Sequence, residues 1–224
     1  MTSETPNPFA RDFEDQSLRS LYRKMKKTAL ARFESATRMR RHQTYSLWTI
    51  SIFSAGLIIF PVVHAFGIPI QISMGWFNTI QVGLALMVLV LSLLISANNV
   101  GDKAEKMHRC GLEVNALCHE ALPFCRTDSH DEEKYEFFRV RYAQILAVYE
   151  NHDPIDFEKV KLLLPDEYKL TDVQRFLIQL RYWMNFWVYG FLMAALVTCL
   201  WFALIGWPPS KPASDEMTQK QNAR

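Results

Sequence analysis

The sequence predicts an all-α integral membrane protein: an oligomer whose chain has three transmembrane helices and a cytoplasmic helical region. Three long apolar blocks contain no Asp, Glu, Lys or Arg. The remaining segments carry apolar residues at helical spacing and show no alternating strand pattern. Basic residues are concentrated on one side of the first block. The net charge of +2 hides this organisation, because charged and apolar residues occupy separate parts of the chain.

The first segment, residues 1–15, lacks the apolar stretch of a signal peptide, so we expect a disordered N-terminus that is not cleaved. Residues 16–43 are predicted to form a basic cytoplasmic helix, in which residues 23–43 hold eight Lys or Arg and one acid. Its apolar positions follow a spacing of three and four, so the helix should continue into the first span: Leu18, Leu21, Tyr22, Met25, Ala29, Phe33 and Ala36.

A transmembrane hairpin is predicted over residues 44–97, with spans at about 45–66 and 76–97. A bilayer core of about 30 Å requires about 20 apolar residues as a helix, and both blocks meet that length. Pro61 should kink or end the first span, because it removes a backbone hydrogen bond. Aromatic rings near the ends of the apolar blocks favour the headgroup level: Tyr45, Trp48, Trp76, Trp183, Trp187, Trp201 and Trp207.

The basic residues set the predicted topology. They precede the first span, whereas the connection between the two spans is uncharged, which places the N-terminus and residues 98–185 in the cytoplasm. A third transmembrane helix at 186–207 then leaves the tail, residues 208–224, outside and disordered.

The cytoplasmic region, residues 98–185, should be helical with two apolar stripes. The first comprises Met107, Gly111, Val114, Cys118 and Ala121, and the second Tyr135, Phe138, Tyr142, Ile145 and Tyr149. A turn at Asp153-Pro154 should precede a short helix that stops before Pro165. Thr171 and Gln174 match a capping box, which would open a long helix running into the third span.

Candidate chemistry is sparse. Glu150, His152, Asp153 and Asp156 are of metal-ligand type, but a turn with capping carboxylates explains them better than a metal site. No spacing indicates a catalytic triad, a pair of catalytic carboxylates or a phosphate loop. We therefore expect no enzyme activity, no metal and no cofactor.

The second span has a polar face. Gln81, Ser92 and Asn99 fall within about 20° of each other on a helix, and Ser96 lies about 60° away. These four residues are the predicted pore lining of an oligomer. The alternative is hydrogen bonding between helices of a bundle, for which Ser46, Thr49 and His64 of the first span would be similar candidates.

Two segments resemble the SLATT family of two-transmembrane effector proteins. They are MKKTALARFESATRMRRHQTYSLWTISIFSAGLIIF, which leads into the first span, and YENHDPIDF at 149–157. The resemblance covers roughly residues 15–165, and the third span departs from the family's two-span pattern. It implies a pore-forming effector in the inner membrane of bacteria, which acts in anti-phage defence by abortive infection and is gated by a nucleotide or oligonucleotide from a partner nucleotidyltransferase.

Anionic lipid headgroups alone would explain the basic run. A phosphate-bearing ligand would be drawn to the same positions, which we predict as ligand-binding: Lys24, Lys26, Lys27, Arg32, Arg38, Arg40 and Arg41. The alternative function is a non-conducting membrane scaffold that tethers a soluble partner through the seam Tyr135–Tyr149.

Overall fold

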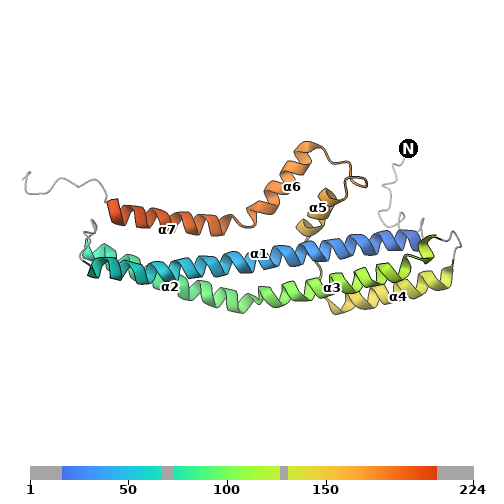
Figure 1. Ribbon diagram of the computed structural model, residues 1–224, viewed down its shortest axis with the longest axis horizontal. Coiled ribbons are helices and arrows are strands. Elements are labelled where there is room, and N and C mark those ends of the chain that lie inside the picture. The colour runs from blue at the N-terminus through green and yellow to red at the C-terminus, as the bar shows by residue number, and fades with distance from the viewer. Residues whose placement is uncertain (1–16, 67–72, 127–130, 206–224) are drawn as a thin grey trace, which may run out of the picture. The chain divides into compact units, whose positions relative to one another are not determined.

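The computed structural model describes residues 17–66, 73–126 and 131–205, and this part of the chain is helical with no strand (Figure 1). The all-α prediction is therefore confirmed. The predicted disordered segments 1–15 and 208–224 lie outside the described residues. The elements are α1 (Leu18–Ala65), α2 (Met74–Asn98), α3 (Val100–Ala121), the 3-10 turn η2 (Phe124–Arg126), α4 (Glu132–Val148), α5 (Pro154–Leu163), α6 (Asp172–Met184) and α7 (Trp187–Ile205).

Two compact units divide the chain. The first comprises residues 1–43 and 99–185, and the second comprises residues 44–98 and 186–224. Helix α1 contributes its N-terminal half to the first unit and its C-terminal half to the second.

Helix α1 is continuous over 48 residues, as the spacing of its apolar residues predicts. Pro61 lies inside it, and the helix runs on to Ala65, so the expectation that Pro61 could end the helix is wrong. Proline removes one N–H donor, whereas ending the helix would free several more backbone groups. In a span surrounded by hydrocarbon, those groups would have no water to bind.

The core of the first unit lies between α1, α3 and α4. It is built from Leu21, Met25, Ala29, Cys110, Val114, Leu117, Cys118, Ala121, Phe138 and Tyr142, with Phe33 and Tyr135 among the partly buried residues around it. Both predicted cytoplasmic stripes therefore face this core. Gly111 allows α3 to approach α1 closely, because a Cβ there would stand 2.8 Å from the ring of Phe33.

Helices α5 and α6 pack against each other within the same unit. Arg181 of α6 binds Glu158 of α5 at 3.2 Å, and Lys159 donates to the side chain of Gln179. The capping box at the start of α6 is confirmed: Thr171 Oγ1 accepts from the Gln174 backbone N–H, and the Gln174 side chain accepts from the Thr171 N–H.

The long helix predicted to run from Thr171 into the third apolar block is wrong, because α6 ends at Met184 and α7 begins at Trp187. The side-chain amide of Asn185 donates to the carbonyls of Arg181 and Tyr182. This amide competes with the backbone donors that would continue the helix, which gives a physical reason for the break.

In the second unit, α1 contacts both other helices. The ring of Phe60 on α1 lies 6.2 Å from that of Phe77 on α2. The Tyr45 ring lies 5.3 Å from that of Phe186 just before α7. At Gly56 a Cβ would stand 3.9 Å from Leu196 Cδ1, so α1 and α7 are neighbours there. Within the described residues, two stretches are long and apolar enough to cross a membrane: α1, and α2 together with α3.

Candidate functional site

The predicted pore-lining residues lie on or next to α2. Gln81 is half-buried, whereas Ser92 and Ser96 are exposed. The Ser92 hydroxyl donates to the carbonyl of Val88 at 2.7 Å, so a backbone group of the same helix already accepts its proton. Within the described part of the chain, the side chains of Gln81 and Ser96 have no such partner. Their polar groups therefore need water or a neighbouring molecule.

Nearly all of α2 is uncovered in a single chain. Phe77 is its one buried residue, while Val82 and Leu94, about 120° apart around the helix, are 69% and 53% exposed. A helix that is largely apolar and largely exposed requires lipid or other subunits around it. Exposure alone does not distinguish the polar face from the apolar one.

Asn99 lies at the junction between α2 and α3 rather than within α2. Its backbone is left-handed, with φ 44° and ψ 41°, which Asn adopts more readily than most residues. Its carbonyl accepts the Lys103 N–H at 3.1 Å, and its side chain makes no capping hydrogen bond. Asn99 is thus placed at the C-terminal end of the predicted polar face.

Polar residues of the first span bind within the second unit. Ser46 donates to the hydroxyl of Tyr189 on α7 at 2.8 Å, and Thr49 donates to the carbonyl of Tyr45. The His64 ring lies 5.3 Å from that of Phe77. At Ser46, the structure shows the hydrogen bond between helices that was the alternative to a pore.

A buried ion pair joins the basic part of α1 to the start of α5. Arg38 Nε donates to Asp156 Oδ1 at 2.7 Å, and Arg38 Nη2 donates to Asp156 Oδ2 at 3.0 Å. Asp156 is fully buried, and Asp153 is a second, more exposed partner of the same guanidinium. Such bidentate geometry is strong and directional, which fixes α5 against α1.

Arg32 makes a second link, six residues earlier on α1. Its guanidinium is almost fully buried and donates to the Glu150 carbonyl, to Asn151 Oδ1 at 3.4 Å and to Met107 Sδ at 3.2 Å. Its Nε has no hydrogen-bond partner in the described structure, and neither does the buried hydroxyl of Ser35. Arg32 and Arg38 together hold α1 to residues 150–156, and we call these contacts the arginine clamp.

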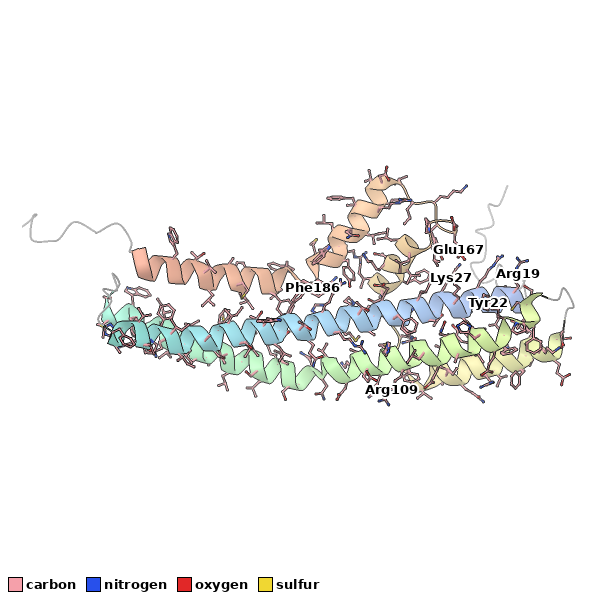
Figure 2. All side chains as sticks on the ribbon, viewed as in Figure 1. Arg19, Tyr22, Lys27, Arg109, Glu167 and Phe186 are labelled. Carbon is pink, nitrogen blue, oxygen red and sulfur yellow. The ribbon has the colours of Figure 1, made fainter. Side chains whose placement is uncertain are left out.

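The other predicted ligand-binding residues have mixed surroundings. Lys27 forms a 2.6 Å ion pair with Glu167, and both residues are labelled in Figure 2. Arg40 pairs with Glu105, and Arg41 donates to the Tyr182 hydroxyl at 3.4 Å. Of the seven predicted residues, Lys24 and Lys26 are exposed and have no ion-pair or hydrogen-bond partner within the described residues. The seven therefore do not form one open basic surface.

The clamp gives the ENHDPID segment a role that sequence reasoning missed. Asp153 is the N-cap of α5, but its side chain makes no capping bond and pairs with Arg38 instead. No metal-ligand cluster is found among the described residues. One signal was available in the sequence: the two segments that carry the family resemblance are the two that the clamp joins.

The seam Tyr135–Tyr149 packs inside the first unit. Phe138 and Tyr142 are buried, and the Tyr142 hydroxyl lies 2.8 Å from that of Thr28 on α1. Tyr149 donates to Glu113 at 2.6 Å, a hydrogen bond that raises the pKa of Tyr149 to about 12. These side chains are occupied within the subunit, so a scaffold would have to use another surface.

The fold and these contacts define a class: a helical protein that combines apolar helices of membrane-spanning length with a charged helical unit, and whose helix α1 belongs to both. The family model described as SMODS and SLOG-associating 2TM effector domain family 5 matches residues 14–203. The chain belongs to this family, SLATT_5, whose description is that of a membrane effector domain. None of the curated proteins and none of the solved structures matches the chain.

Proposed function

We propose that the protein is an oligomeric, pore-forming effector of the bacterial inner membrane, which acts in abortive infection by conduction rather than catalysis. Its N-terminus and residues 98–185 face the cytoplasm. A nucleotide or oligonucleotide made by a partner nucleotidyltransferase gates it. Family membership supports the effector role, and the unsatisfied polar groups on α2 support the pore.

The side chain of Gln81 is the observation that carries the pore. It is half-buried on a mostly apolar, largely exposed helix and has no hydrogen-bond partner in the described structure. A polar group left unpaired in hydrocarbon costs several kcal/mol, so it turns toward water or protein. A ring of copies around a water-filled path would satisfy Gln81 and Ser96 in every subunit.

Helix α7 is the third span in this proposal. Its 19 residues contain no charge and correspond to a length of about 28 Å at 1.5 Å per residue. The hydrogen bond from Ser46 to Tyr189 joins it to α1 near the cytoplasmic end of the first span. This pairing leaves α2 as the helix available to line a path.

Gating would use the arginine clamp. Because α1 is a single helix from the clamp into the first span, a displacement at Arg38 reaches the membrane without an intervening loop. A ligand shifts this equilibrium only if it binds the open and closed states with different affinity. Lys24 and Lys26 are the predicted ligand-binding residues that remain available to an anionic ligand.

Planar bilayers containing the purified protein test the pore. The wild-type protein should give discrete conductance steps, and Gln81→Leu combined with Ser96→Leu should abolish or reduce them. Val82→Leu with Val90→Leu is the matched control, because it changes exposed apolar positions of the same helix. Equal conductance in both double variants would contradict a path lined by α2.

Thiol accessibility provides a second test. Cysteines introduced at Gln81, Ser92 and Asn99 should react with water-soluble reagents, whereas cysteines at Leu89 and Leu93 should remain protected. Equal protection at all five positions would refute the pore. Full biological activity of the Leu variants would instead favour the non-conducting scaffold.

A further inference from the structure

Helix α6 has an exposed apolar face on a helix of otherwise polar character. Five residues on it are between 45% and 68% exposed: Val173, Phe176, Leu177, Leu180 and Met184. At 100° per residue, they fall within an arc of about 100°. Trp183, also exposed, borders this arc. These five residues thus form one continuous stripe along the whole helix, which we call the apolar stripe.

The opposite face of α6 is docked on its own subunit. Tyr182 lies opposite the stripe and is almost fully buried. Lys159 of α5 is 5.0 Å from the centre of the Tyr182 ring, and Arg181 binds Glu158. These contacts fix the rotation of α6, so the apolar stripe points away from the subunit core.

Two connections place α6 near the membrane surface. The Tyr182 hydroxyl accepts a hydrogen bond from Arg41. The first apolar block starts four residues after Arg41, at Tyr45, which is about 6 Å further along the helix. The second connection is at the same C-terminal end: α6 stops at Met184, three residues before the apolar helix α7 begins. Because the helix breaks at Asn185, the axis of α6 need not continue that of α7.

We propose that α6 is an interfacial helix whose apolar stripe is buried in the cytoplasmic leaflet of the bilayer; this rests on the membrane insertion in the proposed function. The occupant of the stripe is an anionic lipid surface. Phe176 and Leu180 enter the boundary between headgroups and acyl chains. Amphipathic helices bind there through the burial of apolar area and through electrostatic attraction to anionic lipids.

Charge on α6 agrees with a lipid partner. Arg175 and Arg181 lie outside the apolar arc and outnumber the one acidic residue, Asp172. Trp183 at the edge of the stripe suits the headgroup level. A second copy of the chain could cover the stripe only with a matching apolar surface at the same height above the membrane. The bilayer needs no such match, because the proposed spans bring it close to both connections.

A photoreactive side chain tests this placement in the full-length protein. p-Benzoyl-phenylalanine replaces Phe176 in one variant and Arg175, which is exposed outside the stripe, in another. Both variants are reconstituted into vesicles of phosphatidylcholine and phosphatidylglycerol and irradiated. Mass spectrometry should find a lipid adduct at position 176, and this adduct should be lost when the probe is at position 175.

Three outcomes would overturn the proposal: a crosslinked dimer from position 176, an adduct with another protein, or equal lipid labelling at both positions. Conductance measured on the same vesicles separates this inference from the proposed function. Conductance steps without a lipid adduct would refute the interfacial helix and leave the pore standing. A lipid adduct without conductance would support α6 at the surface and refute the pore.

Discussion

Breaking the arginine clamp should destabilise the first unit strongly. Arg38→Met keeps the aliphatic stem but removes the charge that neutralises Asp156, whose carboxylate is fully buried. Removing one partner of a buried ion pair costs about 3–5 kcal/mol, because the other charge is left uncompensated. For a unit of this size, such a loss corresponds to a decrease in Tm of about 10–20 °C.

The measurement is thermal unfolding of the detergent-solubilised protein. Arg109→Ala is the matched control: Arg109 also binds an acidic partner, Glu105, at 3.1 Å, but its side chain is 67% exposed. Exposed pairs of this kind contribute about 0.3–0.5 kcal/mol, so the Tm of the control should change little.

A double variant separates the ion pair from the packing. Replacing both charges, in Arg38→Met with Asp156→Leu, leaves no uncompensated buried charge, since Asp153 is 61% exposed, and should recover most of the stability that Arg38→Met alone loses. The reasoning is refuted if Arg38→Met lowers Tm no more than Arg109→Ala. It is also refuted if the two clamp substitutions destabilise additively, since coupled partners must depart from additivity.

Three other perturbations have defined outcomes. Gly111→Ala should cost about 1–3 kcal/mol in thermal unfolding, because its Cβ would overlap the Phe33 ring, whereas Gly83→Ala on α2 has open space and should be neutral or slightly stabilising. Thr171→Ala should lose about 1 kcal/mol through the broken cap of α6, with Asp166→Ala nearby as a neutral control. Burial lowers the pKa of His42, and the charge of Arg38 lowers it further. The unfolded chain therefore takes up this proton first as the pH falls below about 6.5, so stability should decrease on acidification, and His42→Gln should show a flatter profile of Tm against pH.

Local periodicity predicted most of the helices. The spacing of Met107, Val114 and Cys118 identifies the buried face of α3 because that face repeats every three to four residues whatever it packs against. The capping box at Thr171 was recognisable for a similar reason: its two hydrogen bonds join residues three positions apart.

Long-range and competing interactions were not predictable in the same way. Arg38 and Asp156 are 118 positions apart, and nothing in the local sequence of either shows that it is buried. Apolar spacing alone favours a continuous helix through residue 185. Helix α6 ends there because the Asn185 side chain competes with backbone N–H donors for the carbonyl of Arg181. At Pro61, the cost of one missing hydrogen bond was smaller than that of ending the helix.

The clamp and the interfacial helix constrain each other. Asp156 fixes α5 to α1, and α5 holds α6 through Glu158 and Arg181. In the proposed placement, the apolar stripe then holds α6 at the bilayer surface. If the stripe stays in the leaflet, α1 cannot turn about its axis without breaking the contacts of Arg38 or withdrawing apolar side chains from lipid. Arg38→Met should therefore ease gating as well as lower stability, seen as a higher open probability in planar bilayers at temperatures where the variant is folded. Unchanged gating in a folded Arg38→Met protein would show that the clamp stabilises the cytoplasmic unit without controlling the pore.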